Sequence, residues 1–522
     1  MARNPVRHRG INTGLNRPRD RVWTPKRMIS ALHVDGGAAP GGDGSAAAPY
    51  DDFTEIIALG TALSGQTVRL ARGSTIADKL ELNSITDLVV EAYGSGAAPI
   101  IDPSVPIGGT WTAQAGIGPN VFSHSGTAQL HPVIDGVDMT FRSNETTGLL
   151  KDNTSWFGSP VAATLYVNTS AGDPDSATTV MHPGDTYCII GTSCQRVTIR
   201  DIDFRGAQSN CVAFAGAGTE AITVSRSTIS LTGEVTSPAS ATDGIAISGG
   251  GVSDMADSCI VEDITVIGSD GHGSSNHAVE ISFLTGYIIR RLVASLISGR
   301  TIEWWNQCTD GLSEKILSYD TRGVPFNFFN QTGTHDGNVV RNAMVRSRAN
   351  WASASNTQVV GMDANSNTNT KFINCSFSVD DQAPMKPQVG CTIDFINCIS
   401  HMTKASGTGQ SHIFVSGATS SIIDGTDYNR YSVDTASNNW QDSSGLKWNL
   451  ADWRATAGNP DVNADTVGAT PYDDIEAAVP DFGPADTPLA GMLPATDPDI
   501  PTDDYFGKAR TTQTDVGAIQ VT

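Results

Sequence analysis

The sequence contains few charged residues and none of the short motifs that mark common cofactor sites. Charged residues make up 17% of the chain. No apolar run reaches the roughly 18 residues that a membrane-spanning helix needs, so no membrane insertion is expected. Serine-hydrolase, P-loop and dinucleotide-binding signatures are also absent. The enzyme classes that those signatures identify are therefore disfavoured.

Basic residues are outnumbered, and the cysteines show no metal-binding spacing. The net charge of −22 argues against a nucleic-acid binder or a protein of anionic membranes. No Cys-x-x-Cys pair or zinc spacing occurs, so no metal site is predicted. Several cysteines stand in apolar, strand-like stretches, where we expect small core residues. The eight are Cys188, Cys194, Cys211, Cys259, Cys308, Cys375, Cys391 and Cys398.

The N-terminus differs from the rest of the chain because it is basic. Residues 1–34 carry eight Lys and Arg side chains before residue 28, against the single acid Asp20. The segment 1–27 has no apolar core of the kind a secretory signal peptide needs. Two interpretations remain open: a solvated basic tail, or an arm that docks on an acidic partner.

Composition divides the remainder of the chain. Residues 35–49 are rich in Gly, Ala and Pro and are predicted to form a linker. Residues 50–425 hold the repeated strands described below, with an insertion expected near 103–185. Residues 426–522 are acidic, Pro-rich and less periodic, and we expect a C-terminal cap that covers the open strand edge.

A short apolar motif recurs from about Val197 onward, 23 to 38 residues apart from first residue to first residue. Alternating apolar positions predict strands, and strands this short bury their apolar face only by stacking on neighbouring copies. The sequence therefore predicts an all-β, right-handed parallel β-helix. An antiparallel β-sandwich is the alternative, although Asn-Gly hairpin turns never occur. The copies begin at Val197, Ile222, Ile260, Ile288, Leu312, Val339, Phe372 and Phe395.

Two further patterns give the coils a register. Asn342, Asn374 and Asn397 recur at one position, where Asn suits a left-handed corner and can bond its equivalent in the next coil. A second strand series precedes several of the first, which gives those coils at least two strands. We align its members by their first residues, Ile245, Val279, Ile302 and Phe326.

Beyond these repeats, several stretches resemble the pectate-lyase-like superfamily of right-handed parallel β-helices. The opening coils at 65–73, 88–94 and 99–102, an insertion at 111–121 and 164–174, and the C-terminal stretches 504–510 and 515–520 carry the resemblance. It is specific for the fold and weak for the reaction, because this fold hosts lyases, hydrolases and inert adhesins. The basic arm before a β-helix resembles a bacteriophage tailspike, which implies a virion location, trimeric assembly and attachment to other tail proteins through the arm.

The second series also predicts a site. One position after each anchor lie Ala246, Glu280, Glu303 and Asn327, and alternation turns this column outward. Glu280 and Glu303 would then be neighbours about 5 Å apart at the backbone. Two stacked carboxylates repel, so one should have a raised pKa, and an acid–base pair of this kind can cleave a glycosidic bond. The alternative is that both side chains pair with Arg300 or simply face solvent.

Other residues are expected to complete a sugar-binding groove. Trp305 shares the outward face of Glu303, and Phe329 is its equivalent one coil later, whereas Trp304 is predicted to be core. Further substrate-binding candidates lie before the anchors or follow the next coil. They are Asp243, His277, Arg300, His335 and Asp336, in addition to Asn327.

These features and the resemblance favour a virion tailspike that recognises host cells and that binds and hydrolyses a bacterial surface polysaccharide without a cofactor. The resemblance implies that it does so as a homotrimer. One alternative is a polysaccharide lyase acting on uronates, which would use a basic residue and often Ca²⁺. Another is a non-catalytic structural or adhesive virion protein. Unsaturated products would indicate the lyase, and the absence of any cleavage would indicate the adhesin.

Overall fold

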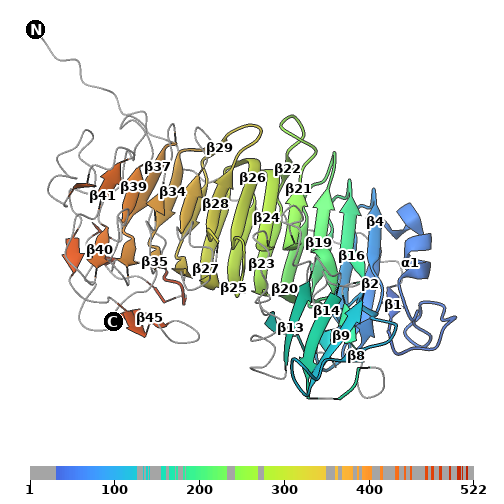
Figure 1. The fold of residues 1–522 in the computed structure, drawn as a ribbon. Coiled ribbons are helices and arrows are strands. Elements are labelled where there is room, and N and C mark those ends of the chain that lie inside the picture. The colour runs from blue at the N-terminus through green and yellow to red at the C-terminus, as the bar shows by residue number, and fades with distance from the viewer. Residues whose placement is uncertain are drawn as a thin grey trace, which may run out of the picture.

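The computed structural model is a parallel β-helix, which confirms the predicted fold class (Figure 1). It describes residues 31–125, 184–231, 242–268, 276–321, 323–347 and 367–379 continuously, together with shorter stretches from 133 to 182 and from 359 to 514. Strands of successive coils follow one another along a single axis, and two long parallel sheets run its length.

The first long sheet contains the strands of the first repeated series. Its strands are β1 (Leu32–Val34), β2 (Thr67–Ala71), β3 (Thr75–Ile76), β5 (Val89–Tyr93), β6 (Ile100–Ile101), β17 (Thr198–Arg200), β18 (Asp203–Phe204), β20 (Thr223–Ser230), β23 (Ile260–Ile267), β25 (Ile288–Ser295), β27 (Leu312–Thr321), β30 (Val339–Arg341), β31 (Met344–Ser347), β34 (Thr370–Ile373), β35 (Ser376–Val379), β37 (Ile393–Ile396), β38 (Ile399–Met402), β40 (Arg430–Val433) and β43 (Asp465–Val467).

The second long sheet contains the second series and carries the candidate site. Its strands are β4 (Leu80–Asn83), β16 (Asp185–Thr192), β19 (Ala207–Ala215), β21 (Thr242–Ser248), β22 (Ala256–Asp257), β24 (Asn276–Thr285), β26 (Ile302–Thr309), β28 (Phe326–Phe329), β29 (His335–Asp336), β32 (Val360–Met362), β33 (Asn367–Thr368), β36 (Met385–Lys386), β39 (Ile413–Val415), β41 (Trp440–Asp442) and β42 (Lys447–Trp448).

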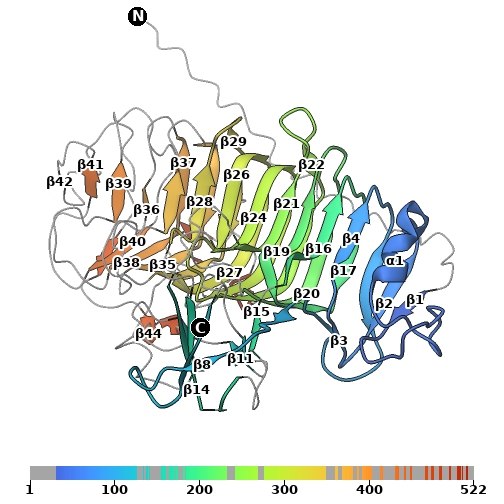
Figure 2. The same ribbon diagram turned by 45° about the vertical axis from the view of Figure 1, so that its right-hand side comes forward.

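The remaining elements are short. Helix α1 (Thr54–Ala58) and the 3₁₀ turn η1 (Gly60–Leu63) lie beside the first coils, and within the described residues no helix is long and apolar enough to cross a membrane. The range predicted as an insertion holds two small sheets that extend from the side of the coils (Figure 2). They contain β8 (Thr112–Ala113), β9 (Val121–Ser125), β12 (Thr140–Phe141), β13 (Thr154–Ser159) and β14 (Thr164–Thr169), and β7 (Val105–Pro106), β10 (Val133–Ile134), β11 (Val137–Asp138) and β15 (Val180–His182). Two hairpins, β44 (Tyr472–Asp474) with β45 (Asp481–Pro484) and β46 (Leu493–Pro494) with β47 (Gln513–Thr514), are found near the C-terminus.

Alternation of apolar and polar residues places the apolar side chains inside the coil, where they form the core. In β26, for example, Ile302 and Trp304 are fully buried, and Trp304 stacks on Phe328 of the next coil with ring centroids 4.2 Å apart. Trp304 is therefore core, as predicted. Each buried aliphatic side chain of this kind stabilises the fold by about 1.5–3 kcal/mol. All eight cysteines are buried thiols, which confirms that they are core residues.

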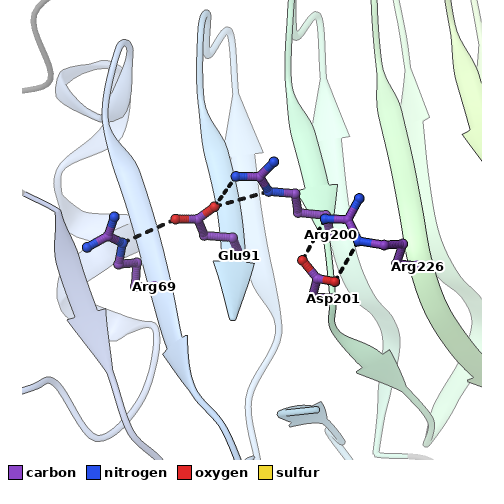
Figure 3. A network of polar contacts seen from close by, with 5 residues as sticks. All are labelled: Arg69, Glu91, Arg200, Asp201 and Arg226. Carbon is purple, nitrogen blue, oxygen red and sulfur yellow. Dashed lines mark hydrogen bonds and ion pairs between the residues drawn. The ribbon is translucent and has the colours of Figure 1, made fainter. Parts of the chain in front are cut away.

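Charged side chains on the outer face of the first sheet pair from coil to coil (Figure 3). Glu91 lies between Arg69 and Arg200, with its Oε1 3.2 Å from Arg69 Nε and its Oε2 3.0 Å from Arg200 Nε. Asp201 and Arg226 form a two-pronged ion pair at 2.7 Å for both contacts. Parallel in-register stacking places opposite charges of successive coils side by side, which removes like-charge repulsion along the ladder.

One corner column has a left-handed backbone in every coil from β17 to β37. The predicted Asn positions are part of it, and Asn397 Nδ2 donates to Asn374 Oδ1 at 2.6 Å. Charged residues occupy the same column in earlier coils, because their ion pairs offset the strain of about 1–2 kcal/mol per residue that a left-handed backbone causes. The sequence pattern did not reveal these positions. The column is Asp201, Arg226, Asp263, Arg291, Lys315, Asn342, Asn374 and Asn397, with φ between 51° and 61°.

The strand pairing differs from the predicted segment boundaries at both ends. Strand β1 lies inside the predicted arm yet pairs in parallel with β2, and Tyr50 forms a bridge with Val34. Strand β40 pairs with β38, and β43 pairs with β40, so the first sheet continues beyond residue 425. Short strands flanked by Gly- or Pro-rich sequence lack the apolar alternation from which the boundaries were drawn.

Candidate active site

Four neighbouring strands of the second sheet carry the candidate site. Val279 pairs with Ile302 and Ile302 with Phe326, so the predicted register is confirmed. Glu280 lies directly beside Glu303, as expected. Their environments differ, however, because the Glu280 side chain is 24% exposed whereas that of Glu303 is 0% exposed. Both glutamates therefore occupy the same column of the sheet, but neighbouring side chains cover Glu303 completely.

His277 connects three carboxylates from three successive coils. Its Nδ1 lies 3.0 Å from Asp243 Oδ1 and 3.5 Å from Glu280 Oε2, and its Nε2 lies 3.0 Å from Glu303 Oε2. His277 and Asp243 are each 2% exposed. A side chain at Gly299 would collide with this imidazole, since a Cβ there would lie 2.8 Å from its Cδ2. Glycine at this position thus leaves the space that the ring occupies.

The carboxylates and the imidazole change each other's protonation. Burial alone lowers the pKa of His277, but the carboxylates of Asp243, Glu280 and Glu303 outweigh it and raise that pKa to about 10. Burial, together with the charge of Glu280, raises the pKa of Asp243 to about 7, although His277 opposes the shift. The raised pKa of His277 favours a cationic ring at neutral pH, and the raised pKa of Asp243 favours the protonated form of that carboxyl group.

Glu303 is covered by polar side chains from neighbouring coils. Asn327 Nδ2 donates to its Oε1 at 2.9 Å, and Arg300 Nη1 lies 3.4 Å from its Oε2. Arg300 Nη1 also lies 2.9 Å from His277 Nε2. These contacts account for the burial of Glu303 and give it a role in holding His277 and Arg300 in place.

An aromatic pair lies beside the carboxylates. Trp305 and Phe329 stack with centroids 4.4 Å apart at an interplanar angle of 29°, and both are half-buried. Trp305 follows Glu303 by two residues and pairs with Ser282 of the preceding coil. The pair offers an apolar face at the edge of the polar group, which is the arrangement predicted for a sugar platform.

His335 and Asp336 do not join this group. His335 is fully buried, with Nδ1 3.2 Å from the backbone nitrogen of Cys308 and Nε2 3.2 Å from the carbonyl oxygen of Phe329. Asp336 accepts a hydrogen bond from Asn369 Nδ2 at 2.7 Å. The described contacts of both residues serve the fold, because His335 contacts the backbone and Asp336 contacts a side chain of the next coil.

Sequence reasoning placed Asp243, His277 and Arg300 at the rim of the groove but missed their mutual contacts. Asp243 pairs with His277 in register, three residues before the outward glutamate column. The only feature of the sequence that could have indicated these contacts was the common spacing of the three residues before the first residue of each strand. Three potential metal ligands, Asp243, His277 and Glu280, offer donor atoms that all lie within 4.8 Å of one another.

Acid should destabilise the fold through two neutral histidines outside the site. Burial lowers the pKa of His335 to about 4, and burial with nearby His401 lowers that of His412 to about 3. A depressed folded-state pKa means that stability present above pH 6.5 is lost as the pH falls, by about 2 kcal/mol per histidine at pH 5. Urea unfolding at pH 7 and pH 5 should therefore lose less stability in His412→Gln than in the unsubstituted protein. Equal losses in the two proteins would contradict this explanation.

Comparison with known proteins identifies solved structures that share the fold. No family model matches the chain, and no curated protein matches its sequence. A structure described as a glycoside hydrolase is 9% identical with a TM-score of 0.50, covering 82% of this chain and 100% of its own. XylC in complex with xylose is 10% identical, also with a TM-score of 0.50, covering 94% of this chain and 98% of its own. At this level of identity the similarity establishes the shared fold.

Proposed function

We propose that the chain is an enzyme that cleaves glycosidic bonds at the outward face of β21, β24 and β26. The observation that carries the proposal is the close carboxyl pair, Asp243 and Glu280, whose donor oxygens lie within 4.8 Å beside the Trp305–Phe329 stack. The chain shares its fold with a structure described as a glycoside hydrolase and with XylC bound to xylose, which is compatible with this proposal.

The short carboxyl separation favours a retaining mechanism, in which the two groups lie about 5–5.5 Å apart. Glu280, the carboxylate most open to solvent, is the nucleophile that attacks the anomeric carbon and forms a glycosyl ester. Asp243 donates its proton to the departing glycosidic oxygen and later removes one from the water that hydrolyses the ester. His277 Nδ1 lies 3.5 Å from Glu280 Oε2, so the His277 cation balances the negative charge of the nucleophile.

The finer proposal concerns the biological setting. We propose a bacterial surface polysaccharide as the substrate and a trimeric tailspike, attached to the virion through the basic arm, as the form of the protein. The arm supports this proposal, because eight basic residues precede a strongly acidic chain and can bind an acidic partner. Sedimentation equilibrium tests the assembly, and a monomer at micromolar concentration would oppose it.

The test of the activity is a screen of purified protein against bacterial surface polysaccharides. Release of reducing ends with retained anomeric configuration, followed by proton NMR, would support the proposal. Products that absorb in the ultraviolet as unsaturated uronates would instead indicate a lyase. No cleavage, combined with retained glycan binding, would indicate an adhesive protein.

Removal of the aromatic platform should weaken substrate binding more than chemistry. Trp305→Ala is expected to raise KM about tenfold, equivalent to about 1.4 kcal/mol, with a smaller effect on kcat. The matched control is Phe506→Ala, which removes an aromatic side chain that is 71% exposed, and it should leave KM unchanged. An unchanged KM in Trp305→Ala would exclude the stack from the substrate groove.

A further inference from the structure

The geometry points to a second capacity of the same cluster. We infer that Asp243, His277 and Glu280 bind one divalent transition-metal ion of the Zn²⁺ type, and that the bound ion blocks cleavage. The binding site stands on its own geometry, whereas the blocking effect rests on the proposed function. The two parts can therefore fail separately.

The first support is the donor geometry. His277 Nδ1 lies 3.0 Å from Asp243 Oδ1 and 3.5 Å from Glu280 Oε2. Ligands at about 2.0–2.2 Å around a tetrahedral zinc ion lie roughly 3.3–3.5 Å from each other. One ion can therefore contact these atoms once it displaces the proton of His277 Nδ1 and the side chains adjust slightly, because the donors come from adjacent, paired strands.

The second support is the burial of two of these donors. Asp243 Oδ1 and His277 Nδ1 face each other at 3.0 Å, and their side chains are 3% and 2% exposed, respectively. A metal ion bound between these atoms would replace the proton that His277 Nδ1 carries in this contact.

The third support lies on the other side of the imidazole. His277 Nε2 is 3.0 Å from Glu303 Oε2, and Glu303 is itself held by Asn327. A carboxylate behind the second ring nitrogen fixes the tautomer and orientation of a metal-binding histidine. The fold already supplies that outer contact.

The donor set indicates the class of ion. One imidazole nitrogen with two carboxylate oxygens suits zinc and similar transition metals, whereas Ca²⁺ and Mg²⁺ prefer oxygen ligands alone. Three protein ligands leave a further position, which the partly exposed Glu280 opens toward solvent. An ion held there would occupy the oxygens of both Asp243 and Glu280, so neither could act on a glycosidic bond.

The test uses untagged full-length protein, freed of metal by a chelator that is then dialysed away. Isothermal titration with Zn²⁺ alone should show one site per chain, and Co²⁺ should give the visible absorption of a low-coordinate site. His277→Gln and Asp243→Asn are expected to weaken binding at least tenfold. His33→Gln, in β1 at the N-terminal end of the β-helix, is the control and should bind as the unsubstituted protein does.

Absence of stoichiometric binding, or equal binding by His277→Gln and His33→Gln, would overturn the metal site. If the buried variants fail to fold, Glu280→Gln decides the matter, because its half-buried side chain can change without disturbing the core. Activity that persists in zinc-loaded protein would refute the blocking effect alone. Calorimetry involves no glycan, so its result does not depend on whether the enzyme proposal is correct.

Discussion

Glu280→Gln is expected to lower kcat for glycan cleavage by about 10²–10⁴-fold while leaving the fold intact. The amide keeps the size of the side chain but cannot attack an anomeric carbon as a carboxylate does. Glu280 is also the partly exposed member of the buried polar group, so the substitution leaves Asp243, His277 and Glu303 in their mutual contacts. Reducing-end release under saturating substrate measures the effect.

The matched control is Glu314→Gln, which removes a carboxylate from the outer face of the other sheet. Glu314 pairs with Arg341 at 2.9 Å and has no described contact with the candidate site. Its kcat should equal that of the unsubstituted protein. Full activity in Glu280→Gln would remove Glu280 from the mechanism, and product of inverted configuration would exclude its role as a nucleophile.

The sequence was sufficient to predict the coil and much of its register. Strict alternation in the strands beginning at Ile245, Val279, Ile302 and Phe326 leaves only one alignment that buries every apolar side chain, so the register followed from packing alone. The left-handed corners occupied by Asn could also be predicted from the sequence, because few residues adopt a left-handed backbone readily. The corners occupied by Arg and Asp could not be predicted in this way, since their stability depends on ion pairs between coils.

The site was predictable as a column of residues but not as a set of contacts. Alternation indicates which face of a sheet a residue lies on, and it placed Glu280 on the outward face, where its side chain is partly exposed. It could not indicate that Asn327 and Arg300 would cover Glu303, because that depends on the reach of long side chains across neighbouring coils. Nor could it reveal His277 as the shared neighbour of three carboxylates. That role depends on the space left by Gly299.

Glu303→Gln should destabilise the fold by about 3–5 kcal/mol, the usual effect of removing one partner from a buried ion pair. Glu303 is fully buried and lies within 4.0 Å of two cationic groups, His277 Nε2 at 3.0 Å and Arg300 Nη1 at 3.4 Å. A neutral amide would leave these charges with less compensation in a region that excludes water. Urea unfolding at pH 7 measures the loss.

Glu91→Gln provides the comparison, because Glu91 also contacts two cations but lies on the outer face of the first sheet. Its side chain is 14% exposed, and those of Arg69 and Arg200 are 35% and 41% exposed. Solvent can compensate these arginines, so a loss of about 1 kcal/mol or less is expected. Equal losses in Glu303→Gln and Glu91→Gln would mean that Asp243 and Glu280 already balance the buried cations. Glu303 would then orient His277 through contact geometry and not through its charge.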